Sequence, residues 1–307
     1  MKLVLIFVLC GVVAAQGDSQ AIAWSRIVWE SDSVTLAGRA VEHAALMVEM
    51  RLDGMGRPVL MQLDTGTPAS VFLGKSYDQL HRNDTVVGQA GRKLGGWVAG
   101  RRFDNEIFVV LPNLEEPHRL GSLGATFFEQ RVLILDFVSQ KIAILDPRQD
   151  LPAKFDFVPL DYRDHKIFVT LTLNGTADRD MIFDSGSSAL PLFTTARRWQ
   201  EWTLRRPDDP RNLMLSAKSW GKEVTLAGAP FQGSICLGKA CLSDPLIFFL
   251  PRVLANLDLE RAPYRIAGVL GNALFDTRYT VVVDLPHRRF GLMPGSAADP
   301  VSARRHK

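Results

Sequence analysis

Two short acidic turns carry the residue types in this sequence that are best suited to chemistry. They read Asp64-Thr65-Gly66-Thr67 and Asp184-Ser185-Gly186-Ser187, and each follows a run of apolar residues typical of a β-strand. Each turn therefore presents one carboxylate, a small hydroxyl side chain and a glycine. Glycine permits a sharp turn and a close approach of the backbone. The hydroxyl groups can donate hydrogen bonds to neighbouring backbone or carboxylate oxygens.

Two carboxyl groups in contact can activate water. In a poorly hydrated site they share one proton, because adjacent negative charges repel each other, and this proton belongs to the pair. The ionised carboxylate can take a proton from water, while the protonated carboxyl can hydrogen-bond the carbonyl group that the water attacks. We therefore expect no metal or cofactor, and we expect a catalytic pair, Asp64 and Asp184, supported by Thr65, Gly66, Thr67, Ser185, Gly186 and Ser187.

The two turns belong to an internal duplication of the chain. Residues 45–54 match residues 166–175, since both begin as apolar strands and end in Asp-Gly or Asn-Gly, a dipeptide typical of hairpin turns. Further on, four residues recur at one constant offset: Gly121, Gly124, Phe128 and Arg131 match Gly268, Gly271, Phe275 and Arg278. We expect two similar halves whose pseudo-twofold relation brings the two acidic turns to their junction.

Length and composition fit two globular lobes. The chain has 307 residues, of which 47% are hydrophobic and 22% charged. Most segments read as short strands separated by Gly, Pro, Asn and Asp, so the expected fold is mostly β with two barrel-like lobes. We predict an N-terminal lobe over residues 16–148, a C-terminal lobe over residues 149–294 and a flexible tail over residues 295–307. A short helix is predicted from Ala196, with Thr195 as its N-cap.

Charge and histidine content exclude several classes of partner. The chain has 36 Lys+Arg and 33 Asp+Glu, and the resulting charge of +3 is too small and too dispersed to indicate binding of nucleic acid or an anionic membrane. The 6 histidines are scattered and lack the spacing of metal ligands. We expect a monomer that acts on a protein or peptide.

The N-terminus has the pattern of a signal peptide. Lys2 precedes an apolar run over residues 3–13, and Ala14-Ala15 supplies a cleavage site, so residues 1–15 are predicted to be removed. The run is shorter than the roughly 20 residues of a membrane helix, so no stable membrane insertion is expected afterwards. We predict a secreted or periplasmic protein. In oxidising surroundings Cys236 and Cys241 are expected to form a disulfide, with two unpaired buried thiols as the alternative.

The duplicated acidic turns resemble the active-site motifs of the pepsin-like aspartic proteases. Residues 120–124 and 269–271 resemble that family's apolar-apolar-Gly strands, which cross behind the aspartates, and the resemblance spans residues 34–293. It implies a bilobal acid-protease fold with compact, retropepsin-like lobes, because the two motifs lie closer together than in typical pepsins. It also implies an endopeptidase that binds an extended polypeptide in the cleft between the lobes.

The family covers its cleft with a hairpin flap that carries a tyrosine. The candidate here is residues 94–100, in which Gly95 and Gly96 provide mobility and Trp97 replaces the tyrosine; the alternative role of Trp97 is packing on its own lobe. Trp220 occupies the corresponding region of the second half. We expect it to pack in the core, because the family's second lobe lacks a true flap.

Two other functions fit part of this pattern. One is a non-catalytic peptide-binding or inhibitor protein on the same fold, since a fold alone does not establish activity. The other is a two-carboxylate glycosidase, whose carboxyl groups stand several ångströms apart and need no duplicated Asp-hydroxyl-Gly turn. Both turns are complete in this sequence, which favours the protease.

Overall fold

The computed structural model of the protein describes residues 21–31, 33–80, 92–116, 118–251 and 259–295. These residues fold mainly as β-strands, as predicted, with the short helices α1 (Gly74–Leu80) and α2 (Ala196–Thr203). The predicted signal peptide lies outside the described residues, as does the predicted tail from residue 296 onward. None of the helices in the described part of the chain is long and apolar enough to cross a membrane.

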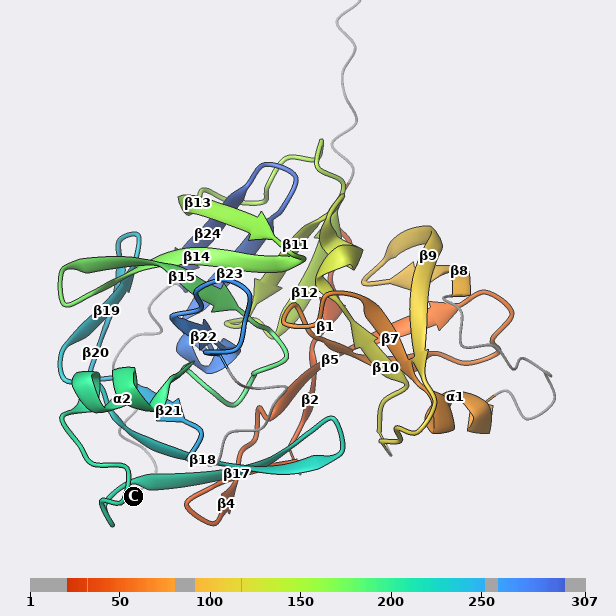
Figure 1. Ribbon diagram of the computed structural model, residues 1–307. Helices are drawn as coiled ribbons and strands as arrows, with labels where there is room; N and C mark the ends of the chain where they lie inside the picture. The colour runs from red at the N-terminus through yellow and green to blue at the C-terminus, as the bar shows by residue number, and fades with distance from the viewer. Residues whose placement is uncertain (1–20, 32, 81–91, 117, 252–258, 296–307) are drawn as a thin grey trace, which may run out of the picture.

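The first half of the chain forms a sheet of seven strands that closes on itself. In spatial order the strands are β2 (Val28–Glu30), β5 (Ala45–Leu52), β6 (Val59–Leu63), β10 (Gly121–Leu123), β7 (Ser70–Leu73), β9 (Arg101–Leu111) and β8 (Arg92–Val98). Pairing of β5 with β8 closes the sheet into a barrel, seen on the right of Figure 1. Alternate side chains point into this barrel, where Leu46, Phe72 and Phe108 are fully buried.

The second sheet joins the two halves through its central strands. β11 (Val132–Asp136) lies antiparallel to β23 (Tyr279–Asp284), and each is flanked by its hairpin partner, β12 (Lys141–Leu145) or β24 (Arg289–Pro294). β1 (Ser25–Arg26) pairs with β12, and β13 (Asp156–Arg163) pairs with β24. Since β11 and β23 are equivalent strands of the duplication, the two halves pair through the same element.

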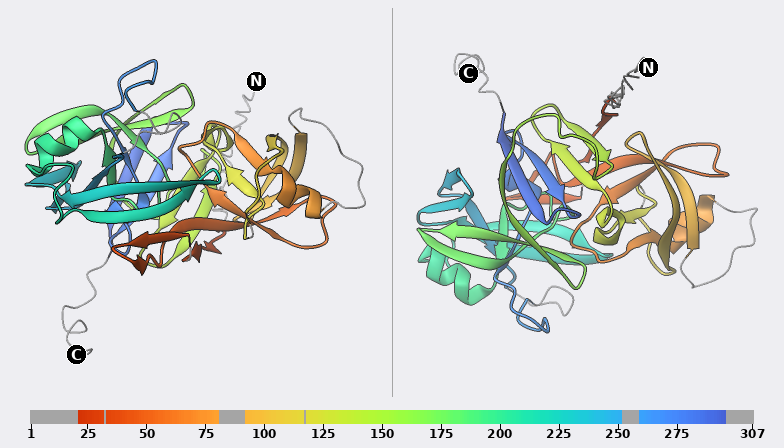
Figure 2. Two further views of the ribbon diagram at one scale, coloured as in Figure 1. Left: turned by 60° about the horizontal axis from the view of Figure 1, so that its bottom comes forward. Right: turned by 90° about the horizontal axis from the view of Figure 1, so that it is seen from above.

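The rest of the second sheet surrounds the core of the second half. It comprises β14 (Lys166–Leu173), β15 (Thr176–Phe183), β16 (Leu192–Thr194), β17 (Leu213–Ser219), β18 (Lys222–Pro230), β19 (Ser234–Leu237), β20 (Ala240–Ser243), β21 (Leu246–Phe249) and β22 (Gly268–Leu270). Two strands from the start of the chain, β3 (Val34–Leu36) and β4 (Arg39–Ala40), extend this sheet, because β3 pairs with β17. Residues 34–40, which the sequence assigned to the N-terminal lobe, thus pair with the second half (Figure 2).

Equivalent strands of the two halves have equivalent partners. β6 runs parallel to β10, and β15 runs parallel to β22. β10 is antiparallel to β7 and β22 is antiparallel to β16, while the pairs β7–β9 and β16–β21 are parallel. A short helix follows β7 in one half and β16 in the other. The repeated sequence therefore folds into a repeated strand arrangement.

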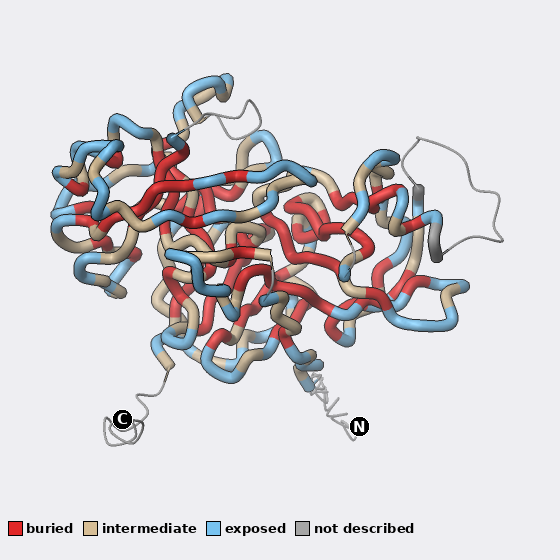
Figure 3. The backbone as a smooth tube through the Cα atoms, turned by 90° about the horizontal axis from the view of Figure 1, so that it is seen from below, coloured by how far each residue is buried: buried red, intermediate tan, exposed pale blue. Residues whose placement is uncertain are grey.

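Apolar packing is continuous between the halves. One cluster of buried side chains includes Phe72 and Phe108 of the first half together with Phe183 and Trp199 of the second. Figure 3 shows buried segments running through the interior of both halves, with exposed segments at the hairpin ends. This shared core fixes the position of one half against the other.

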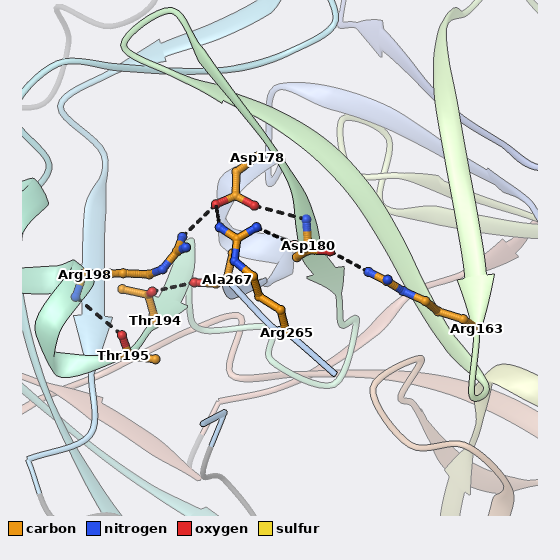
Figure 4. Close-up of polar contacts among 8 residues, drawn as sticks. All are labelled: Arg163, Asp178, Asp180, Thr194, Thr195, Arg198, Arg265 and Ala267. Carbon is orange, nitrogen blue, oxygen red and sulfur yellow. Dashed lines mark hydrogen bonds and ion pairs between the residues drawn. The ribbon is translucent and has the colours of Figure 1, made fainter. Parts of the chain in front are cut away.

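Polar contacts and a disulfide stabilise the outside of the second half. The Thr195 hydroxyl accepts a hydrogen bond from the Arg198 backbone N–H, which is the predicted N-cap of α2. Asp178 and Asp180 of β15 form ion pairs with Arg163, Arg198 and Arg265 at 2.5–2.9 Å (Figure 4). Cys236 and Cys241 face each other across the β19–β20 hairpin and form the predicted disulfide.

Candidate active site

Each acidic turn begins where a buried strand ends beside an apolar-Gly strand. The Asp64 N–H donates to the Leu123 carbonyl at 3.0 Å, and the Asp184 N–H donates to the Leu270 carbonyl at 2.8 Å. The glycines that follow these strands leave room for the turns. A Cβ at Gly124 would lie 2.4 Å from the Ala69 backbone, and a Cβ at Gly271 would lie 1.9 Å from the Ser187 carbonyl oxygen. A larger residue at either glycine would displace the turn beside it.

The two turns meet at the junction of the halves. A Cβ at Gly66 would lie 2.3 Å from Asp184 Cγ, and a Cβ at Gly186 would lie 2.6 Å from Asp64 Cγ. The Gly66 N–H also donates to Asp184 Oδ1 at 3.0 Å. The glycine of each turn thus packs against the carboxyl group of the other. The structure brings Asp64 and Asp184 together, as the duplicated sequence predicts.

Thr65 and Ser185 join the turns through reciprocal hydrogen bonds. The Thr65 N–H donates to Ser185 Oγ, and the Ser185 N–H donates to Thr65 Oγ1, both at 3.0 Å. Each hydroxyl then donates to a backbone carbonyl of the opposite half: Thr65 Oγ1 to Phe183 at 3.1 Å, and Ser185 Oγ to Leu63 at 3.0 Å. Both side chains are fully buried. Four bonds between the halves therefore fix the position of one turn against the other.

The remaining predicted support residues orient the carboxyl groups. Thr67 Oγ1 donates to Asp64 Oδ2 at 2.8 Å, and Ser187 Oγ donates to Asp184 Oδ2 at 2.7 Å. Backbone donors reach the other oxygens, from the Thr67 N–H to Asp64 Oδ1 at 3.0 Å and from the Gly186 N–H to Asp184 Oδ1 at 2.8 Å. Each carboxyl group is thereby held in one orientation by its own turn.

Burial controls the protonation of the pair. Desolvation, followed by the negative charge of Asp184, raises the pKa of Asp64 to about 7. The hydrogen bond from Thr67 and the positive charges of Arg119 and Lys166 act in the opposite direction. The pair consequently retains one proton through the acid range.

A cavity of about 770 Å³ is lined by both Asp64 and Asp184. Its apolar wall in the first half includes Val71, Leu73, Leu111 and Leu114, and its apolar wall in the second half includes Ala189, Leu190, Phe193 and Leu215. A hollow of about 1010 Å³ lies beside α2 in the second half. Asp178, Arg198 and Arg265 of its lining form ion pairs with one another (Figure 4), so the cavity at the junction is the stronger candidate site.

The structure does not bring the predicted flap residues to this cavity. Gly95, Gly96 and Trp97 lie on β8, which pairs with β5, and none of the three lines the cavity. Trp97 is 49% exposed, and the Arg102 guanidinium lies 5.9 Å from the centre of its ring. Of the two roles considered for Trp97, contact with its own half is the one that the structure supports.

The hairpin of β17 and β18, from the second half, lines the cavity instead. Trp220 stands at its turn and contributes to the cavity wall, whereas the sequence analysis expected it in the core. A Cβ at Gly221 would lie 3.6 Å from Leu114 of the first half, so the turn reaches across the junction. Pairing of β17 with β3 supports this hairpin, a contact that the repeat does not predict.

Three polar side chains near the pair were missed by the sequence analysis. Gln62 Nε2 donates to the Gly186 carbonyl at 3.2 Å, and Arg119 donates to Gln62 Oε1. From the other half, Lys166 Nζ donates to the Gly66 carbonyl. The signal available in the sequence was that Gln62 lies within an apolar strand and that Lys166 begins another. Their contacts depend on strand register, which the sequence does not specify.

Comparison with protein-family models finds no match for this chain, and neither does comparison with curated proteins. Within the residues that the structure describes, no group of three or more His, Cys, Asp or Glu side chains is arranged to hold a metal ion. The candidate site therefore rests on the geometry of the two turns and the cavity above them.

Proposed function

We propose that this protein is an aspartic endopeptidase of the pepsin-like type, with Asp64 and Asp184 as its catalytic pair. The observation that carries the proposal is the reciprocal bonding of Thr65 and Ser185 between the two acidic turns. This bonding holds together two equivalent turns whose carboxyl groups both line one cavity. The duplicated strand arrangement supports a bilobal acid-protease fold with compact lobes.

The proposed reaction needs one water molecule and one shared proton. Burial and the negative charge of Asp184 raise the pKa of Asp64, so the pair holds one proton, and the protonated carboxyl group hydrogen-bonds the scissile carbonyl oxygen. The ionised carboxylate accepts a proton from the water as the water oxygen attacks the carbonyl carbon, and the protonated carboxyl group passes its proton to the carbonyl oxygen. As the C–N bond breaks, the proton taken from water passes to the amide nitrogen, and a hydroxyl group of the tetrahedral intermediate returns a proton to the other carboxylate. A carboxylic acid and an amine are released.

The cavity suits an extended polypeptide. Apolar walls on both sides of the pair can hold the side chains that flank the scissile bond, while the peptide main chain can pair with strand edges. The disulfide between Cys236 and Cys241 supports export to an oxidising compartment. We propose a secreted or periplasmic enzyme on this basis and on the predicted signal peptide.

Isosteric variants of the pair test the proposal directly. We expect Asp64→Asn and Asp184→Asn to abolish hydrolysis of a peptide library, because neither variant can both activate water and polarise the carbonyl. Asp150→Asn, at an exposed position, is the matched control and should retain wild-type activity. Circular dichroism checks that all three variants fold. Hydrolysis by either Asp64→Asn or Asp184→Asn at the wild-type rate would refute the assignment.

A non-catalytic binding protein is the second candidate, because the cavity and its apolar walls suit a bound peptide as well as a substrate. A statine-type transition-state mimic separates the two candidates. An enzyme both hydrolyses peptides and binds the mimic through its paired carboxyl groups, whereas a binding protein retains a peptide uncleaved. The contact between the two turns disfavours a glycosidase, whose carboxyl groups need several ångströms between them.

A further inference from the structure

The duplication is broken at one position beside the catalytic pair. In the first half Met47 pairs with Gln62, so Ala45 is the residue of β5 that comes opposite Asp64. In the second half Phe168 pairs with Ile182, so Lys166 is the residue of β14 that comes opposite Asp184. The same position of the repeat thus holds a buried apolar side chain in one half and a cation in the other.

The Lys166 ammonium group faces the junction of the two turns. It donates to the Gly66 carbonyl and lines the same cavity as the pair. Among the described residues it forms no ion pair, and the charges that act on its pKa are those of Asp184 first and Asp64 second. Burial lowers the pKa of Lys166, and the attraction of the two carboxylates acts against that decrease.

Other charged groups line the cavity from the remaining elements around Lys166. Arg119, which precedes β10, lies 3.6 Å from Glu116, and Lys218 of β17 lies 3.7 Å from Glu223. Glu30 of β2 and Lys222 of β18 also line the cavity. Arg119 and Lys218 thus each have a carboxylate partner outside the pair, and the charge of Arg119 also acts on Asp64. The charge of Lys166 is directed at the pair itself.

We propose that Lys166 is a positioning residue that keeps the negative charge of the pair on Asp184 and moves the range in which the pair holds one proton toward lower pH. A cation attracts the nearer carboxylate more strongly, and it makes loss of a proton from either carboxyl group easier. The kinetic consequence rests on the proposed function, whereas the titration of the two carboxyl groups does not.

The test combines a titration with a pH–rate profile. The carboxyl ¹³C resonances of Asp64 and Asp184 are followed across the acid and neutral range in the wild type, Lys166→Gln and Lys166→Arg. Lys166→Gln keeps a donor for the Gly66 carbonyl but removes the charge, so loss of the cation is separated from loss of the bond. Lys166→Met is a second uncharged variant. Lys154→Met, at an exposed position between β12 and β13, removes the same charge away from the cavity and serves as the control.

We expect the first ionisation of the pair to move upward by about one pH unit in Lys166→Gln and Lys166→Met, since an opposite charge nearby lowers a carboxyl pKa by about that much or more. Both limbs of the profile for peptide hydrolysis should move in the same direction. Lys166→Arg and Lys154→Met should follow the wild type. A purely structural role for Lys166 would change the rate without moving the limbs.

The two proposals fail in different ways. Hydrolysis that depends on both aspartates, combined with unchanged titrations in Lys166→Gln and Lys166→Met, would overturn the role of Lys166 and leave the protease assignment intact. A shifted titration in a protein that cleaves no peptide would support the role of Lys166 and remove the protease assignment. A Lys166→Arg variant that titrates like Lys166→Gln would also overturn the inference, because its charge is retained.

Discussion

Thr65 and Ser185 show why the second residue of each turn must be a small hydroxyl. Each side chain accepts from one backbone N–H and donates to one carbonyl of the opposite half. A buried hydrogen bond contributes about 1 kcal/mol, and a buried partner left without one costs about 1–3 kcal/mol. Either a threonine or a serine hydroxyl can make both bonds, whereas alanine would leave two backbone groups unsatisfied at the junction.

The raised pKa of Asp64 gives a pH-dependent contribution to stability. In the folded protein, burial raises the pKa of this carboxyl group to about 7, while the unfolded chain releases the proton near the ordinary aspartate pKa of 3.8. The folded state therefore binds more protons in that interval, so its stability falls as the pH rises from about 4 to about 7. We expect Asp64→Asn to remove this decrease and to be the more stable protein at pH 7, by on the order of a few kcal/mol.

Urea unfolding of the wild type and Asp64→Asn at a series of pH values measures this contribution. Asp150→Asn is the control, because an exposed carboxyl group has nearly the same environment in both states. The free energies of unfolding of the wild type and the control should diverge from that of Asp64→Asn above about pH 4. Parallel curves for all three proteins would show that folding leaves the protonation of Asp64 unchanged.

The residues of the acidic turns were predictable because their types stand together within one short turn, even though Thr65 and Ser185 bond across the halves. Carboxylate, small hydroxyl and glycine are required within one turn, and the duplication supplies the second copy. Lys166 and Gln62 were not predictable in this way, since each acts on a turn that is distant in the sequence. Their roles depend on the register of β14 and on the packing of the halves.

At the scale of elements, the two hairpins that carry Trp97 and Trp220 lie differently relative to the junction of the halves. The β8–β9 hairpin of the first half pairs with β5 and leaves Trp97 half exposed. The β17–β18 hairpin of the second half reaches across the junction, and Trp220 and Gly221 at its turn have φ values of 51° and 76°. Positive φ at both positions is typical of a tight two-residue turn. The Trp-Gly dipeptide could have located this turn, but not the direction in which the hairpin projects.

The positions of these hairpins predict that substitution of Trp220 weakens ligand binding and that substitution of Trp97 does not. Trp220→Ala should weaken binding of a statine-type mimic by about tenfold or more, because it removes a large apolar contact from the cavity wall. Trp97→Ala is the matched control and should leave this affinity unchanged, because Trp97 does not line the cavity. Titration calorimetry measures both affinities. Weaker binding in Trp97→Ala alone would restore the β8–β9 hairpin as the cover of the site.

At the scale of the whole molecule, the site exists only where the halves are assembled. Asp64 and Asp184 come from different halves, the cavity has walls from both, and β3 of the first half supports the hairpin of the second. The sequence predicted two related halves and their junction, because a duplicated pattern with one carboxylate in each copy requires such a meeting point. It did not predict that β3 pairs with β17 of the second half, since nothing in the repeat marks a strand that pairs outside its own half.

The pairing of β11 with β23 predicts that the halves unfold together. Ile134 and Val282 pair at the centre of this contact and are fully buried, and the main apolar cluster extends through both halves. We expect native-state hydrogen exchange to give the same free energy of unfolding for amides of β6 and of β15.

Val282→Ala should lower the free energies measured at β6 and at β15 equally, by about 2 kcal/mol, because it leaves a cavity in the shared sheet. Val138→Ala, at an exposed position, should change neither. A decrease confined to β15 would mean that the second half opens alone, and the carboxyl pair would then be separated without unfolding of the first half.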